Sequence, residues 1–187
     1  MTTPARDTFF YEGQPYLLIL RSAGELFEPE RFGITTKMLN TACYHGFLCT
    51  YEITDGRLFL ASLEIQATAP GGYPLINGVP PAFDEVSICD YVAPASYSGI
   101  CLPMPFTGSL VLGADLDYSF WFCMFTTPDW MWRKLLALEL VDGRVRAVND
   151  RSDEMAEIRA SKPKPIFSLD GECLNTDELC SMKISKT

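Results

Sequence analysis

The stretch Thr41–Ile65, TACYHGFLCTYEITDGRLFLASLEI, decides the fold that this sequence predicts. It reads as two long strands joined at Asp55-Gly56, a dipeptide that suits a tight type I′ turn because both central residues need positive φ. A two-residue turn fixes the register, so we expect the pairs Ile53–Leu58, Tyr51–Leu60, Glu52–Phe59 and Thr54–Arg57. The more apolar face of the first strand should point into the core; it carries Cys43, His45, Phe47, Cys49, Tyr51 and Ile53.

A second Asp-Gly hairpin is expected over residues 135–148, LLALELVDGRVRAV. Its turn at Asp142-Gly143 predicts that Leu140 faces Val145 and that Glu139 faces Arg146, a favourable cross-strand charge pair. The sequence ELVDGRV of this hairpin aligns with EITDGRL of the first, with Glu and Asp-Gly-Arg identical. The match has two explanations, a duplicated sheet unit or convergence of two short hairpins.

The rest of the chain favours an all-β fold with one or two short helices, an antiparallel barrel or sandwich built from the Asp-Gly hairpins. Two short strands are predicted over Phe9–Leu20 around Gly13-Gln14, and another strand over Tyr118–Phe125. Residues 67–105 are rich in Pro and Gly and predict an irregular connection. Residues 150–187 predict a charged tail that packs on the sheet, with a short helix from Ser152, a last strand at Ile166–Leu169 and a final helix capped by Asn175.

Size and charge limit the classes of function. The 187 residues, 48% hydrophobic and 21% charged, suit a single β-rich domain over 1–187 with a substantial core. The formal net charge of −9 argues against binding to nucleic acid or to an anionic membrane, because either would require a basic face on the protein. Acidity suits a protein partner with a basic surface, and it also serves solubility alone.

The cysteines and the N-terminus predict a cytoplasmic protein. The chain has seven cysteines, an odd number, and several lie in apolar runs such as FLCTY, where Cys acts as a small buried hydrophobe. The N-terminus MTTPARDT lacks the basic and apolar segments of a signal peptide, and no apolar run approaches the ~18 residues of a membrane span. We therefore expect free thiols in a reducing compartment.

The common motifs of enzymes are missing from the sequence. It contains no Gly-rich phosphate loop, no His-Glu-x-x-His, no Cys-x-x-Cys and no Gly-x-Ser-x-Gly. A lone histidine, His45, excludes a multi-His metal site within this chain, and Cys49 would lie about 13 Å from it along a flat strand. Cys43 and His45 are the residues that an enzyme would use, but nothing identifies an oxyanion hole. We expect a structural His45, no catalytic residue, no metal and no cofactor.

Acidic and aromatic residues of two loops form the candidate partner-binding site. Asp115 and Asp117 alternate in GADLDY, a pattern that also suits turns, calcium or acid–base chemistry. The loop Asp129-Trp130-Met131-Trp132 is either a core plug or an exposed hot spot for a partner. The candidate contact residues are therefore Asp115, Asp117, Asp129, Trp130 and Trp132.

A family resemblance points to the same class of function. Its residues are the segments YEGQP (11–15), GI (33–34) and TACYHGF (41–47), which runs into YEI (51–53), with the hairpin region 106–148. The chain resembles uncharacterised bacterial β-rich proteins, some of which are similar in size and acidity to immunity proteins encoded beside secreted toxins. The resemblance implies a stoichiometric inhibitor that covers the active site of a basic toxin domain. The alternatives are a barrel that binds a small apolar ligand, or an enzyme that uses Cys43 and His45. The oligomeric state stays open.

Overall fold

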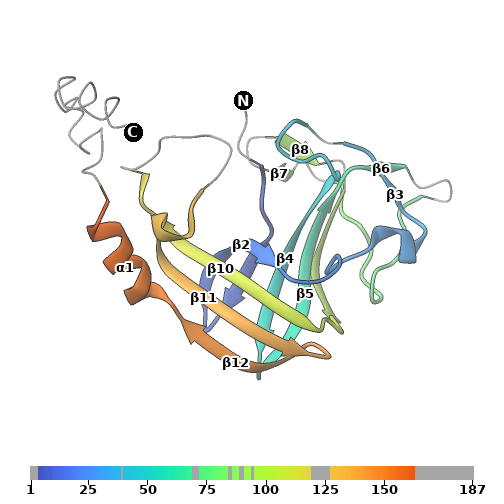
Figure 1. The fold of residues 1–187 in the computed structure, drawn as a ribbon. Coiled ribbons are helices and arrows are strands. Elements are labelled where there is room, and N and C mark those ends of the chain that lie inside the picture. Colours follow the sequence, from blue (N-terminus) through green and yellow to red (C-terminus); the bar gives the residue numbers. More distant parts are fainter. Residues whose placement is uncertain are drawn as a thin grey trace, which may run out of the picture.

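A closed β-barrel forms the body of the protein. The computed structural model describes residues 4–38, 40–68, 72–83, 86–88, 91–93, 95–118 and 127–162. Within these residues seven strands form a ring in the order β12-β11-β10-β2-β1-β4-β5, and pairing of β12 with β5 closes it (Figure 1). The prediction of a β-dominated fold is confirmed, and of its two forms the barrel is the one observed.

The barrel strands are β1 (Thr8–Tyr11), β2 (Gln14–Arg21), β4 (Phe47–Thr54), β5 (Arg57–Ile65), β10 (Gly108–Leu116), β11 (Trp132–Val141) and β12 (Arg144–Asp150). A further strand, β9 (Ala95–Pro103), pairs with β5 outside the ring. Two short pairs join β3 (Thr35–Thr36) to β6 (Ala67–Thr68) and β7 (Val86–Ile88) to β8 (Tyr91–Ala93). The helical elements of the described residues are the 3-10 turns η1 (Pro29–Phe32) and η3 (Asp129–Met131) and the helix α1 (Ser152–Ala160).

Side chains fill the inside of the barrel. Alternate residues along strands such as β2, β4 and β5 point inward, and those at the centre of the core are fully buried. The rings of Phe9 and Tyr51 are in contact, with centroids 4.8 Å apart. Leu60, Leu110 and Leu138 close the core from three further strands, each with no exposed surface. The barrel interior is thus a packed core, as small barrels require.

The central hairpin has the predicted register, but its first strand starts later than predicted. All four predicted β4–β5 pairs are present, and Asp55 and Gly56 have φ values of 51° and 68°. The strand begins at Phe47 instead of near Cys43, because the chain turns at Gly46. A Cβ on Gly46 would lie 2.0 Å from the Lys37 carbonyl oxygen, so only glycine fits this close approach.

The expected inward face is therefore shorter than the sequence suggested. Its strand residues Phe47, Cys49, Tyr51 and Ile53 are buried as predicted. His45 lies before the strand, where its side chain is exposed.

The two Asp-Gly-Arg turns meet and close the barrel. Arg57 of β5 is paired directly with Arg144 of β12. On either side of this pair, the Leu58 N–H donates to the Gly143 carbonyl and the Val145 N–H donates to the Gly56 carbonyl, both at 2.8 Å. We call these paired residues, Gly56–Leu58 and 143–145, the seam. Each of its two hydrogen bonds joins the residue after the arginine of one motif to the glycine of the other, so the seam has local two-fold symmetry.

This symmetry does not extend through the barrel. Next to the first hairpin, β1 runs parallel to β4, whereas next to the second, β10 runs antiparallel to β11. The expectation of a purely antiparallel sheet is therefore wrong for the β1–β4 pair. The β1–β2 turn is also displaced by one residue from the prediction, since Glu12 and Gly13 carry the positive φ values.

Two further predictions need correction. The irregular connection that was predicted over 67–105 is shorter in the structure, because its last part is the nine-residue strand β9, whose residues Ala95 and Tyr97 are buried. A bulge in β12 places Glu139 opposite Ala147 instead of Arg146. The Glu139 carboxylate instead accepts a hydrogen bond of 2.7 Å from the Ser109 hydroxyl of β10.

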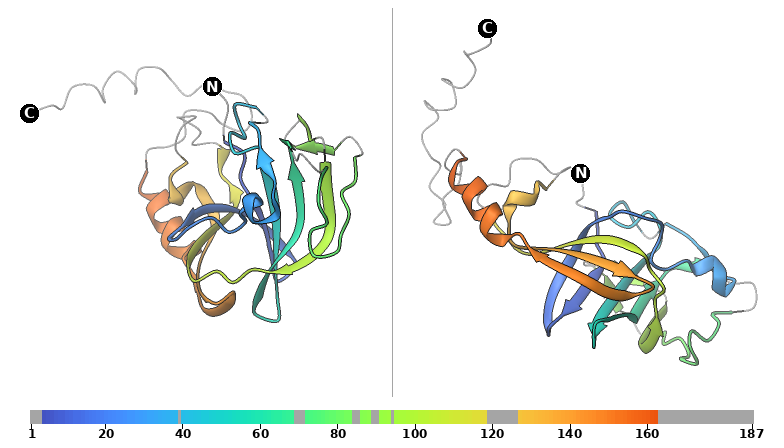
Figure 2. Two further views of the ribbon diagram at one scale, coloured as in Figure 1. Left: turned by 90° about the vertical axis from the view of Figure 1, so that its right-hand side faces the viewer. Right: turned by 60° about the horizontal axis from the view of Figure 1, so that its bottom comes forward.

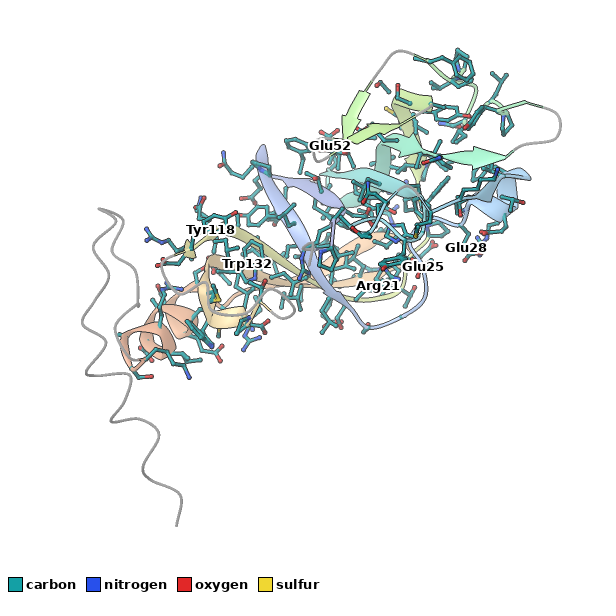
Figure 3. The ribbon with its side chains drawn as sticks, turned by 90° about the horizontal axis from the view of Figure 1, so that it is seen from above. Arg21, Glu25, Glu28, Glu52, Tyr118 and Trp132 are labelled. Carbon is teal, nitrogen blue, oxygen red and sulfur yellow. The ribbon has the colours of Figure 1, made fainter. Side chains whose placement is uncertain are left out.

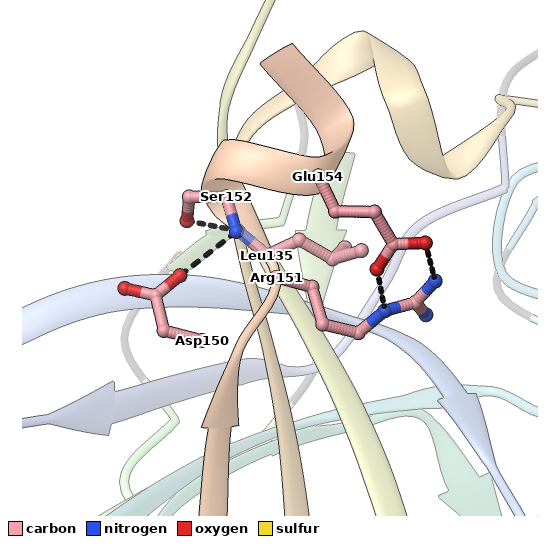
Figure 4. A network of polar contacts seen from close by, with 5 residues as sticks. All are labelled: Leu135, Asp150, Arg151, Ser152 and Glu154. Atoms are coloured by element: carbon pink, nitrogen blue, oxygen red, sulfur yellow. Dashed lines mark hydrogen bonds and ion pairs between the residues drawn. The ribbon is translucent and has the colours of Figure 1, made fainter. Parts of the chain in front are cut away.

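Helix α1 starts at Ser152, as predicted, and covers part of the outer wall. It lies against β11 (Figure 1 and Figure 2), with Met155 packed on Trp132 and Leu135. The Leu135 N–H donates to the Ser152 hydroxyl at 3.1 Å, and the Ser152 N–H donates to Asp150 at 2.9 Å (Figure 4). The expected packing of the tail on the sheet thus holds for 150–162. The predicted elements at 166–169 and after Asn175 lie outside the described residues, as does the strand over 118–125 beyond Tyr118.

Candidate functional site

A cleft of about 680 Å³ lies beside the N-terminal segment and the chain that follows β2. Its lining comes from several separate segments of the sequence that the fold brings together. Figure 3 shows three of the charged residues, Arg21, Glu25 and Glu28, one after another along the segment that leaves β2. The lining residues are 4–7, 18–21, Glu25, 27–30, Thr36, His45 and Phe47.

Two hydrogen bonds from main-chain amides hold Asp7 in place in the cleft. Its main-chain carbonyl accepts the Leu18 N–H at 2.9 Å, and its carboxylate Oδ1 accepts the Cys49 N–H at 2.9 Å. Because the parallel β1–β4 pairing begins one residue later, at Thr8 and Thr50, the Asp7 side chain supplies an acceptor where the ladder starts. Among the described residues its carboxylate forms no ion pair.

Burial raises the pKa of the Asp7 carboxyl. The hydrogen bond from Cys49 and the nearby charges of His45 and Arg21 act in the opposite direction and offset part of this effect. The outcome is a carboxylate held in place by one oxygen, whose charge is only partly compensated.

Arg6, the neighbour of Asp7, fixes the N-terminal segment to β2. Its guanidinium Nη1 donates to the carbonyl oxygens of Leu18 and Ile19, at 3.1 and 3.4 Å. Burial lowers the pKa of this guanidinium. Because both contacts are to main-chain carbonyls, Arg6 neutralises no carboxylate of the cleft.

Three glutamates, Glu25, Glu28 and Glu30, also line the cleft. Glu25 is paired with Arg21, and Glu28 forms two hydrogen bonds with Arg31, at 2.8 and 2.9 Å. Glu30 is exposed at the start of η1, and no ion pair joins it to another described residue. The charge of Asp7, only partly compensated, and that of Glu30 are therefore not neutralised by an ion pair with any described residue.

Apolar side chains lie between these charges. Leu18, Phe27 and Phe47 line the cleft with small exposed fractions of 8%, 2% and 8%. Acidic groups beside apolar side chains suit a lysine or arginine side chain, which has an apolar stem and a cationic head.

Cys43 and His45 lie in different surroundings. The Cys43 thiol is buried and donates to the Phe47 carbonyl at 3.2 Å. The exposed His45 lines the cleft, and its ring meets the ring of Phe47 edge-on, with centroids 4.8 Å apart. The buried, engaged thiol does not favour the use of Cys43 as a nucleophile.

The structure gathers the predicted contact residues at the end of the barrel near α1. The Asp117 N–H donates to the Met131 carbonyl at 2.8 Å, which joins β10 to η3. Asp115 pairs with Lys134 at 3.5 Å and Asp117 pairs with Arg133 at 3.2 Å, so basic neighbours already offset these charges. Asp129 is exposed at the start of η3.

The two tryptophans of this loop differ in exposure. Trp132, labelled in Figure 3, is 3% exposed and packs in one buried cluster with Met155 of α1, which agrees with the core alternative for the loop. Trp130 is partly buried, with the Lys162 ammonium 5.4 Å from the centre of its ring. The carbonyls of both tryptophans accept hydrogen bonds from Arg159 of α1.

Reasoning from the sequence missed the cleft. Asp7 lies in a short polar segment before β1 and carries no motif, and its position depends on the parallel β1–β4 pairing. The acidic run FEPERF (27–32) was the available signal, since two glutamates flank the proline that starts η1.

The described residues contain no group of three or more His, Cys, Asp or Glu side chains that could hold a metal ion. In the same part of the chain, no helix is long and apolar enough to cross a membrane. Comparisons with protein-family models, curated proteins and solved structures gave no match to this chain.

Proposed function

We propose that this chain is a non-enzymatic binding protein that neutralises a basic protein partner, most specifically an immunity protein that binds the toxin domain made beside it. The observation that carries the proposal is the part-buried Asp7 carboxylate, which lines an apolar-walled cleft without an ion-pair partner among the described residues. A lysine or arginine of the partner would neutralise the charge of this carboxylate. The net charge of −9 adds long-range attraction for a basic protein.

The cleft replaces the loops around Asp115 and Asp129 as the first surface to test. Asp115 and Asp117 already have basic neighbours, so their charges attract a partner less than those of Asp7 and Glu30. The alternative of an apolar ligand within the barrel receives no support, since the inward side chains of the described strands are packed together and buried.

The test is capture of the partner by matched variants of the tagged protein. Wild type, the double variant Asp7→Asn/Glu30→Gln and the control Asp115→Asn are used as bait in the native lysate, and the complexes are analysed by native mass spectrometry. We expect one stoichiometric basic protein with wild type and control. Capture by the double variant should fall about tenfold or more, since loss of a buried ionic contact weakens binding strongly. Equal capture by all three baits contradicts the cleft, and an acidic partner contradicts the charge argument.

A further inference from the structure

The arginines of the chain fall into two groups. All of them lie in described residues, and most are engaged by carboxylates or main-chain carbonyls: Arg6, Arg21, Arg31, Arg133, Arg151 and Arg159. The other three, Arg57, Arg144 and Arg146, are exposed and make no ion pair or side-chain hydrogen bond with the described residues. Arg57 and Arg144 are paired where β5 and β12 close the barrel, and Arg146 lies two residues further along β12.

Arg57 and Arg144 are held unusually close for two like charges. The hydrogen bonds of the seam are formed by the residues on either side of this pair. The pair is therefore of the non-hydrogen-bonded kind, in which the Cα atoms are only about 4.5 Å apart and the side chains approach most closely. Like charges directly opposite each other destabilise a sheet.

Neither strand neighbour compensates this pair. Arg57 faces Thr54 on β4, and Arg144 faces Val141 on β11, so no carboxylate lies directly across from either guanidinium. The chain has 24 acidic and 15 basic residues, so acidic residues to pair with them are plentiful. Three exposed arginines that form no ion pair with the described residues are thus a local feature that the overall composition does not explain.

We propose that the seam is an anion site for a single phosphate group, carried by inorganic phosphate or a small phosphate ester. Two guanidinium groups side by side present planar pairs of N–H donors that match the oxygens of one phosphate. Arg146, two residues along β12, adds a third positive charge. Binding of the anion removes the repulsion within the pair, so the ligand and the seam stabilise each other.

A single phosphate fits the surroundings better than a polyanion. Asp55 and Asp142 are exposed at the tips of the two turns, immediately next to the glycines of the seam. Their carboxylates would repel the further phosphates of a nucleic acid. The site is also separate from the acidic cleft, since Phe47 of the cleft and Thr54 beside the seam are the first and last residues of β4. The proposal therefore does not depend on the proposed partner.

Thermal unfolding and titration calorimetry with inorganic phosphate test the site. The variants are Arg57→Gln/Arg144→Gln and, as a matched control, Arg31→Gln/Arg133→Gln, which removes two exposed arginines that have carboxylate partners. At constant ionic strength, phosphate should raise the unfolding temperature of wild type and control in a saturable way. Affinity for phosphate should fall at least about tenfold in the seam variant, because that variant loses the charged hydrogen bonds to the phosphate oxygens.

A second measurement also tests the Arg57–Arg144 pair, and here the substitution should raise the unfolding temperature. In low salt without phosphate, the seam variant should unfold at a higher temperature than wild type, because the repulsion is gone; with phosphate the order should reverse or the two should become equal. Equal phosphate responses in the seam and control variants overturn the proposal. So does a wild-type response to a short DNA duplex but not to phosphate, which would indicate a surface for polyanions.

Discussion

At the residue scale, Asp7 combines a structural role with a charge that the fold leaves partly uncompensated. Its Oδ1 accepts the Cys49 N–H, a role that the carbonyl oxygen of asparagine could also fill. Burial raises its pKa above the ordinary value of 3.8, so the folded protein binds this proton more tightly than the unfolded chain does. The stability that Asp7 contributes is then highest below pH 3.8 and is lost as pH rises through the folded pKa.

Asp7→Asn should therefore stabilise the protein at neutral pH, because the hydrogen bond is kept and the buried charge is removed. Relative to wild type, the gain should shrink as pH falls toward 3.8, where the carboxyl of wild type also becomes neutral. Urea unfolding of both proteins between pH 4 and pH 7, followed by tryptophan fluorescence, measures the difference. Destabilisation by the variant across this range would show that the charge itself supports the fold.

The two turn glycines give a matched pair of substitutions. Gly56 and Gly143 have φ values of 68° and 67°, so alanine meets the same backbone strain, about 1–2 kcal/mol, at each. A Cβ on Gly56 meets nothing within 4 Å, whereas on Gly143 it would lie 2.1 Å from the Met104 carbonyl oxygen. Gly143→Ala should cost at least ~2 kcal/mol more than Gly56→Ala in denaturant unfolding, because the seam must shift. Equal losses would mean that Met104 does not lie against this turn.

At the element scale, helix α1 depends on a few polar contacts at its first turn. The buried Leu135 N–H of β11 has the Ser152 hydroxyl as its acceptor. Ser152→Ala leaves this N–H without a partner and should cost about 1–3 kcal/mol. Ser161→Ala at the exposed end of the helix removes only a local bond to Ile158 and should change stability by less than about 0.5 kcal/mol. Chemical denaturation of the two variants tests this ordering, and a larger effect of Ser161→Ala would contradict it.

The elements also show where sequence reasoning succeeds. The Asp-Gly turns fixed the register of the central hairpin because local chemistry alone decides a two-residue turn. The prediction that Glu139 faces Arg146 was wrong because a bulge in β12 displaces the partner by one residue. Bulges carry little signal in a single sequence. Strand β9 was missed because positive φ at Gly99 and Cys101 interrupts the alternation of its buried and exposed residues.

At the scale of the whole molecule, closure of the barrel depends on contacts between residues far apart in sequence. The seam joins Gly56–Leu58 to 143–145, and the cleft joins the segment before β1 to the start of β4. The identical Asp-Gly-Arg motifs were visible in the sequence, but nothing in them indicated that they pair with each other. The site depends on the parallel β1–β4 pairing, which a pattern of hairpins does not predict.

A ring closed by the seam should unfold as one cooperative unit. The Leu58 and Val145 amides, which donate across the seam, should exchange with solvent only through global unfolding. Hydrogen exchange followed by NMR should give both amides the free energy of unfolding measured with denaturant. If these two amides exchange much faster than those at the centre of β4, the barrel opens locally at the seam.

One variant, Asp7→Asn, tests both the proposed function and the cost of burying the Asp7 charge. Unfolding temperature and capture of the partner are measured on the same preparation of Asp7→Asn beside wild type. If Asp7 is kept for binding, the variant should unfold at a higher temperature and retain much less of the basic partner, a trade of stability against function. A variant that retains as much partner as wild type, whatever its stability, would contradict the acidic cleft as the binding site.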